Sequence, residues 1–169
     1  IHQLNGKTEY PNVADFRKTE GFRLPTEVEW EWFARGGEIA MQDGTFDYDY
    51  SGSNNLSEVA WYNDLSEYTD YWDTFEVETN DVGTKKPNQL GIYDCIGNVW
   101  EWCYDTTEGN IEKGKLYVYT AVDSRKKYRE IRGGSWKNGE NTCTLFFRDY
   151  YDSFHGESTI GFRVVRTII

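Results

Sequence analysis

The clearest pattern of hydrophobic and polar positions is RLPTEVEWEWFARGG at residues 23–37. Trp30 and Phe33 lie three positions apart with other apolar residues at helical spacing, which predicts an amphipathic helix. Thr26 and Glu29 have the spacing of a capping box at its start. Two glycines close the run and predict its end.

Strands are less clearly marked along the chain. The alternation in GNVWEWCYD, residues 97–105, predicts a half-buried strand. Residues 43–80 are loop-like except for a short strand predicted at VAWY, residues 59–62. Further short strands are predicted at residues 116–122, 130–132 and 160–168. The sequence thus predicts one α+β domain over residues 1–169, with few helices, short strands and much loop.

Composition narrows the class of protein. Hydrophobic residues make up 38% of the chain, but 17% of all residues are aromatic, and large rings can fill a core in place of many aliphatic side chains. The net charge of −11 repels phosphate backbones, so we expect no nucleic-acid partner. No apolar run approaches the roughly 18 residues of a membrane span, and we expect no membrane contact by this domain. Three cysteines cannot complete a disulfide framework.

Five fragments occur in a fixed order: RLPTEVEWEWFARGG, VAWY, VGTKKPNQLGIYDCIGNVWEWCYD, RGGSW and IGFRVVR. In this order the chain resembles the formylglycine-generating-enzyme (sulfatase-modifying factor) family from Gly21 to Arg166. The resemblance implies a C-type lectin-like fold, with few helices and short twisted antiparallel strands. It also implies a first helix upstream of Ile1.

The resemblance implies two kinds of catalysis, and this chain lacks the catalytic residues that each of them needs. The cysteine pair that the resemblance implies would fall on Asn138 and Cys143, and an amide cannot replace a thiolate. Iron-dependent sulfoxide synthesis needs a histidine cluster, whereas the chain has only His2 and His155. We therefore expect no enzyme activity and no required cofactor. The alternative is an oxidase of the formylglycine-generating type with an altered active site.

The segment after RGGSW resembles a second class, the target proteins of diversity-generating retroelements. Their editable segment begins after a GGSW-like strand, keeps a Cys and an Arg, and closes at IGFR; Cys143 and Arg148 have matching spacings. Randomising the adenines of AAC codons yields Tyr, Asp, Phe, His, Ser, Asn and Thr, but not Lys or Glu. Most residues from 137 to 159 are in the reachable set, and Lys137, Glu140 and Glu157 are not. Residues 137–159 are called the C-terminal segment below.

The composition of the C-terminal segment is that of an antibody paratope, with rigid aromatic rings among adaptable polar side chains. We expect Arg148 to hold the scaffold, and Asp149 and Asp152 to favour a partner that presents Arg or Lys. The alternative is that the rings pack in the core, although the run does not alternate as a buried strand would. The predicted ligand-binding residues are Asn138, Asn141, Phe147, Asp149, Tyr150, Tyr151, Asp152, Phe154, His155 and Ser158.

A structural calcium ion is a further implication of the family resemblance. By position its ligands would be the carboxylates of Asp94 and Glu101 and the carbonyls of Gly97 and Val99, a mixed oxygen set that calcium accepts. The alternative is that Glu101 pairs with a backbone amide or an arginine. Trp100 and Trp102, on either side of Glu101, are both expected in the core.

The leading hypothesis is a non-enzymatic, receptor-like binding protein for a protein or other surface ligand. The resemblance implies display on a bacterial cell surface, with a lipid anchor that this chain does not contain. A third hypothesis is a structural or sensory lectin-like domain of fixed sequence. A lectin-like fold does not by itself imply sugar binding.

Overall fold

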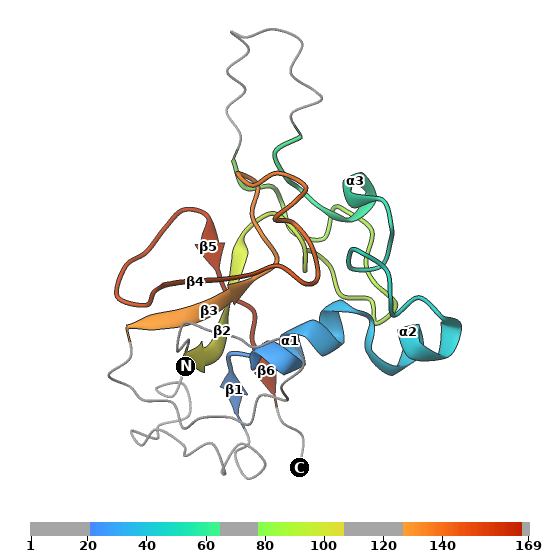
Figure 1. Cartoon of the computed structure of the whole chain (residues 1–169), viewed down its shortest axis with the longest axis horizontal. Coiled ribbons are helices and arrows are strands. Elements are labelled where there is room, and N and C mark those ends of the chain that lie inside the picture. Colours follow the sequence, from blue (N-terminus) through green and yellow to red (C-terminus); the bar gives the residue numbers. More distant parts are fainter. Residues whose placement is uncertain (1–20, 65–77, 107–126, 167–169) are drawn as a thin grey trace, which may run out of the picture.

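The computed structural model describes residues 21–64, 78–106 and 127–166 (Figure 1). The strand predicted at residues 116–122 lies outside these ranges. Within them the protein has three helices, a four-stranded sheet and a two-stranded sheet. The predicted α+β class, with few helices, short strands and much loop, is confirmed.

The predicted first helix is confirmed as α1, Glu27–Ala34. The Thr26 side chain accepts from the Glu29 amide at 3.1 Å, and the Glu29 carboxylate accepts from the Thr26 amide at 2.8 Å. The helix ends before Gly36, whose φ of 87° is left-handed and favours glycine. The chain then enters a second helix that the sequence pattern did not predict, α2, Gly37–Asp43.

The main sheet has the strand order β4-β3-β2-β5. Its strands are β2 (Trp100–Thr106), β3 (Tyr128–Arg132), β4 (Arg148–Asp152) and β5 (Ile160–Gly161). β3 is antiparallel to both β2 and β4, whereas β5 pairs with β2 in parallel. The strands predicted at 97–105 and 130–132 are confirmed. Antiparallel strands were expected, and the pairing of β2 with β5 is a parallel exception.

Two strand predictions were wrong in detail. The strand predicted at residues 160–168 is divided between β5 and β6 (Val165–Arg166), which pairs with β1 (Phe22–Arg23) in the smaller sheet. The strand predicted at residues 59–62 is replaced by the end of a short helix, α3 (Leu56–Val59), and a single bridge from Trp61 to Gly97. Gly97 has φ +72°, and a Cβ there would lie 2.3 Å from the Trp61 carbonyl oxygen, so the bridge needs glycine.

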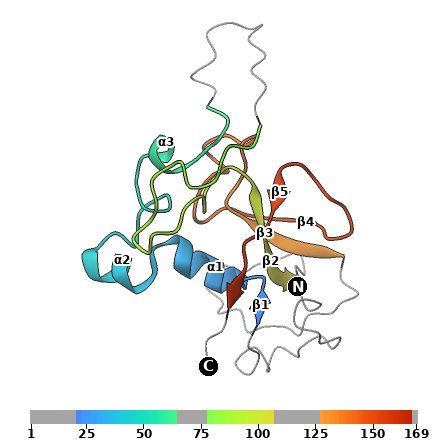
Figure 2. The ribbon, with the colours of Figure 1, turned by 180° about the vertical axis from the view of Figure 1, so that it is seen from behind.

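The core lies between α1 and the main sheet. Figures 1 and 2 show the helices gathered on one side of the molecule and the four-stranded sheet on the other. Trp30 and Ile96 are fully buried there, with the free thiols of Cys95, Cys103 and Cys143. Trp100 is buried as expected, whereas Trp102, two positions later on the same face of β2, is only half-buried. No helix of the described ranges is both long and apolar enough to span a membrane.

Candidate functional site

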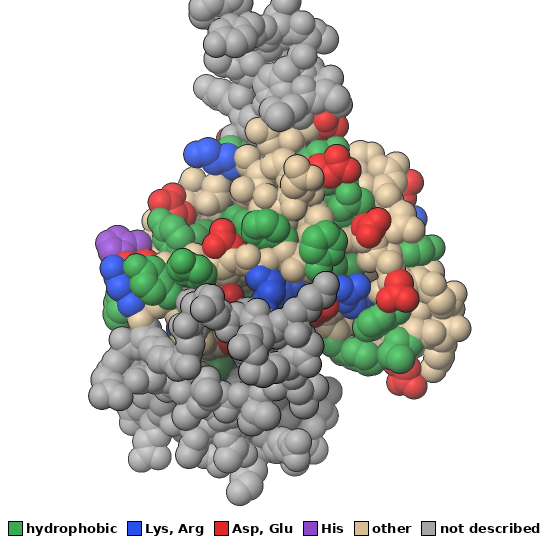
Figure 3. Space-filling view, viewed as in Figure 1, with side chains coloured by type: hydrophobic (Ala, Val, Ile, Leu, Met, Phe, Trp, Pro, Cys, Tyr) green, Lys and Arg blue, Asp and Glu red, His purple; other side chains and the backbone are tan. Residues whose placement is uncertain are grey.

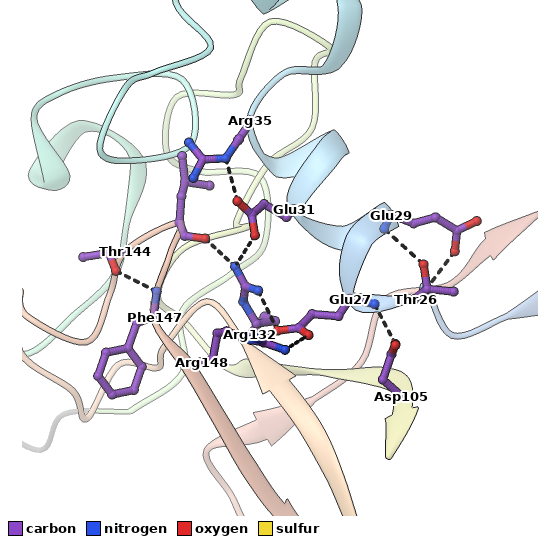
Figure 4. Close-up of polar contacts among 11 residues, drawn as sticks. Thr26, Glu27, Glu29, Glu31, Arg35, Asp105, Arg132, Thr144, Phe147 and Arg148 are labelled. Carbon is purple, nitrogen blue, oxygen red and sulfur yellow. Dashed lines mark hydrogen bonds and ion pairs between the residues drawn. The ribbon is translucent and has the colours of Figure 1, made fainter. Parts of the chain in front are cut away.

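A buried ion cluster holds the start of β4 against α1 (Figure 4). Glu27, from the first turn of α1, accepts from Arg132 at 2.8 Å and is bound bidentately by Arg148. Arg132, 1% exposed, also reaches Glu31 at 3.2 Å and the carbonyl of Leu145. Arg148 therefore holds the scaffold, as predicted, and joins the C-terminal segment to the first helix.

The turn between β3 and β4 is bonded internally. Asn138 Oδ1 accepts from the Ser135 amide at 3.1 Å and from the Ser135 hydroxyl at 2.6 Å. The Asn138 carbonyl accepts from the Asn63 amide at 2.9 Å. Asn138 was predicted to bind ligand, but its side chain is used within this turn.

Cys143 lies beside Asn138 in that turn. Its thiol is fully buried and donates to the carbonyls of Ser135 and Asn138, each at 3.7 Å. Burial raises the pKa of the Cys143 thiol to about 12, so the thiol stays protonated near neutral pH. The two positions implied for the cysteine pair are adjacent, but only one carries sulfur and that sulfur is not poised as a nucleophile.

Four of the predicted binding residues project from β4 and the loop that follows. Tyr150 is 51% exposed and Phe154 72% exposed, and Asp149 and His155 are exposed as well. In Figure 3, hydrophobic side chains gather at the left edge of the molecule beside basic and histidine side chains, where the outer ends of β3 and β4 lie in Figure 1. Ser158 and Asn141 are also exposed. These side chains are therefore not packed in the core, which was the alternative stated for the C-terminal segment.

One contributor to this surface was not predicted. Tyr128, at the start of β3, packs edge-on against Tyr150 with ring centroids 5.5 Å apart and is 43% exposed. It comes nine positions before the C-terminal segment begins, and only the β3–β4 register joins the two tyrosines. The weak signal for it was an aromatic residue two positions before the predicted strand at 130–132, on the same face as Glu130.

Phe147 and Tyr151 point to the other face of the sheet. Phe147 packs on Trp100 at 6.1 Å and Tyr151 on Trp102 at 6.4 Å, and both are half-buried. The Tyr151 hydroxyl donates to Glu157 at 2.7 Å. The alternative of core packing therefore holds in part for these two residues, because their rings pack against the tryptophans of β2.

Asp152 organises the loop after β4. Its carboxylate meets Lys127 Nζ at 2.8 Å and His155 Nδ1 at 2.7 Å, and it accepts from the Phe154 amide at 3.0 Å. Partial burial pushes the pKa of Asp152 upward, but these contacts outweigh it and bring the pKa down to about 2. With its oxygens occupied, Asp152 positions Phe154 and His155; of the two aspartates predicted to attract a cation, Asp149 is the more exposed.

The structure thus separates the predicted binding residues into two groups. Asn138 and Asn141 belong to the turn before β4, whereas Phe154, His155 and Ser158 follow its end (Figure 1). His155 is bonded to Asp152, the register partner of Tyr128. Ser158 lies at the other end of the sheet, because the carbonyl of the next residue, Thr159, accepts from the Trp100 amide at the start of β2.

The two carboxylates predicted to bind calcium have different surroundings. The Glu101 carboxylate accepts from Arg163 at 2.7 Å and from the Trp30 indole at 2.8 Å, so its negative charge already faces a cation, which was the alternative stated for it. Asp94 Oδ2 accepts from the Gly83 amide at 2.7 Å, and Asp94 Oδ1 is buried without a partner among the described residues. In those ranges no group of three or more His, Cys, Asp or Glu side chains could hold a metal ion.

Comparison with known proteins places the chain in a family. The model of the sulfatase-modifying factor enzyme 1-like domain matches residues 4–168. The chaperone protein LppX of Paenibacillus barcinonensis is 34% identical over 155 residues, which is 87% of this chain and 50% of LppX. The formylglycine-generating enzyme of Mycobacterium tuberculosis is 37% identical over 102 residues, 59% of this chain and 31% of the enzyme.

Two solved structures are similar at comparable identity. CarF superposes with a TM-score of 0.69 at 32% identity, over 90% of this chain and 49% of CarF. Treponema denticola variable protein 1 superposes with a TM-score of 0.68 at 35% identity, over 87% of this chain and 48% of that protein. The chain spans half the length of LppX and about half of each of these two structures. The fold and the family match agree, and the chain belongs to the sulfatase-modifying factor enzyme 1-like family, with the C-type lectin-like fold of the formylglycine-generating enzymes and the Treponema variable protein.

Proposed function

We propose that this chain is a non-enzymatic binding module that presents a diversified surface on a lectin-like scaffold. The surface comprises β4 and the loop to residue 158, with Tyr150, Phe154 and His155 as its main contacts. Its ligand is a protein. The similarity to a variable protein at 35% identity supports this assignment.

The observation that carries the proposal is the exposure of Tyr150 and Phe154. Single exposed rings are common on folded proteins, but a contiguous patch of exposed aromatic side chains marks an interaction site. Tyr128 extends the cluster, and His155 lies at its margin with a side chain 69% exposed. Tyrosine and phenylalanine supply large contact areas with few torsions to fix, which is why such residues dominate binding energy at protein interfaces.

The turn at Asn138 and Cys143 supports the absence of oxidase chemistry. An oxidase of the formylglycine-generating type would need a reactive thiol pair, and here the amide of Asn138 is bonded to Ser135 while the thiol of Cys143 is buried. The Cys143→Ala variant gives a direct comparison with this alternative. Turnover of a cysteine-containing peptide that disappears in Cys143→Ala would favour the enzyme over the binding module.

The test of diversification is deep sequencing of the coding region for residues 137–159 across a population of the source cells. We expect substitutions at exposed positions such as 149, 150, 154 and 155, and constancy at Arg148 and Cys143. Positions 138 and 152, although reachable from AAC codons, should vary less because their side chains are bonded within the scaffold. A uniform population would leave a fixed-sequence lectin-like domain as the better description.

Display on a bacterial cell surface is part of the proposal. An antibody raised against this domain should label intact source cells, and brief protease treatment of those cells should remove the signal. Labelling that appears only after the cells are permeabilised would contradict surface display.

A further inference from the structure

β4 lies at the edge of the main sheet. β3 pairs with one side of it, and in the described ranges no strand pairs with the other. An edge strand carries a row of outward N–H and C=O groups that another chain can pair with. The same strand carries Tyr150, the central residue of the proposed binding surface.

The hydrogen-bond pattern shows which groups point outward. The Ser153 amide donates to the Lys127 carbonyl at 2.8 Å, which continues the β3–β4 ladder past Asp152. Because alternate residues of an antiparallel strand face the partner, Tyr151 points its backbone groups toward β3, while Tyr150 and Asp152 point theirs away. The Tyr150 amide agrees, since it donates to the Asp149 carboxylate at 2.8 Å.

Tyr150 and Asp152 each point one N–H and one C=O away from β3, and two of these four groups already have hydrogen-bond partners. The Tyr150 N–H has the Asp149 carboxylate, and the Asp152 C=O accepts from the His155 amide at 3.0 Å. The two groups between them, the Tyr150 C=O and the Asp152 N–H, have no partner among the described residues. A C=O at one residue and an N–H two residues later form the pair that a single residue of a parallel strand engages.

We propose that the edge of β4 takes up an extended segment of a partner protein as a parallel fifth strand, bonded to the Tyr150 C=O and the Asp152 N–H. This inference rests on the proposed function of the same surface. Addition of a strand to a sheet edge is a general mode of peptide recognition, in which the backbone supplies affinity and the side chains supply specificity.

The side chains around the edge indicate what the segment carries. Tyr150 and Tyr128 line one face, which favours an apolar side chain at the matching alternate position of the segment. The exposed Asp149 carboxylate, on a chain of net charge −11, favours a Lys or Arg nearby. Diversification of positions 149, 150 and 154 would then change the sequence preference, while the backbone bonds remain the same for every variant.

The experiment uses the full chain as bait for a phage-displayed library of random linear peptides of roughly a dozen residues. Enriched peptides are synthesised with single N-methyl groups at each position in turn, because an N-methyl amide cannot donate to the Tyr150 carbonyl. We expect affinity to fall about tenfold or more at one position, with little effect at its two immediate neighbours. Amide exchange at Asp152 should slow about tenfold or more when the peptide binds.

Losses spread evenly over consecutive positions, or an Asp152 amide that exchanges as fast as in the free protein, overturn strand addition. A library that yields no enriched peptide overturns it as well. The Tyr150→Ala variant separates this result from the proposed function, because it removes the ring and keeps the backbone. Peptides that lose affinity for Tyr150→Ala but show no single position at which N-methylation abolishes binding would keep the aromatic surface as the binding site and exclude only the added strand.

Discussion

The two halves of the C-terminal segment have similar residue types but opposite structural roles. In the turn before β4, Asn138 and Cys143 are bonded to their neighbours and withdrawn from solvent. In β4 and the loop after it, Tyr150 and Phe154 are exposed. The C-terminal segment is therefore not a uniform surface, because part of it holds the strand that presents the other part.

The largest effect is expected where the segment is joined to the first helix. In Glu27→Ala the fully buried guanidinium of Arg132 loses its closest carboxylate and Arg148 loses its bidentate pair with Glu27. We expect a loss of about 3–5 kcal/mol in the free energy of unfolding, measured by urea titration with tryptophan fluorescence. The control is Glu31→Ala, whose side chain is 39% exposed, with a loss of about 1 kcal/mol or less. Equal losses would mean that the cluster does not depend on Glu27.

The turn can be separated from the exposed half with two asparagines. Asn138→Ala leaves the Ser135 amide and hydroxyl, both buried, without their acceptor, and should lower the free energy of unfolding by about 1–3 kcal/mol. Asn141 is exposed, so Asn141→Ala should change it by less than about 0.5 kcal/mol. Thermal unfolding of both variants in parallel is sufficient. Similar midpoints would remove the distinction between scaffold and surface within the segment.

A pair of phenylalanines tests the two faces of the presented half. Phe147 packs on Trp100, whereas Phe154 is 72% exposed. Phe147→Ser should cost about 1–2 kcal/mol of stability for the apolar area it uncovers, and Phe154→Ser less than about 0.5 kcal/mol. The two losses are compared by urea titration, with the same dependence of the free energy of unfolding on urea concentration used for both variants. A large cost at Phe154 would indicate that its ring is packed in solution and is not a contact residue.

Local patterns were sufficient to predict part of the fold. The capping box at Thr26 and Glu29 and the alternation at Trp100 and Trp102 are signals within a few residues, and both elements formed as expected. α2 was missed because it begins at a glycine that ordinarily ends a helix. β4 was missed because its alternation is hidden, with an aspartate and a tyrosine on each of its faces.

The candidate site depended more on contacts between distant parts of the chain. That Tyr150 and Phe154 project to solvent agrees with the paratope-like composition. That Tyr128 adjoins them follows only from the β3–β4 register, and that Asp152 is bonded to Lys127 follows from the same pairing. Composition therefore indicated the kind of surface, but it could not separate residues that contact a ligand from residues that hold the loop.

The smallest effect concerns that last distinction, at Asp152. Its pKa of about 2 lies below the value of about 3.9 for an unfolded chain. The stabilising contribution of the carboxylate is therefore fully present above about pH 4 and is lost as the pH falls through about 2. We expect a carboxyl carbon NMR titration of Asp152 to have its midpoint near pH 2, with the amide shifts of Phe154 and His155 following it. In Lys127→Gln the midpoint should rise, because one of the two cationic partners is gone. A midpoint near 4 in both proteins would mean that Asp152 is free in solution, and it would then return to the set of residues available to a cationic partner.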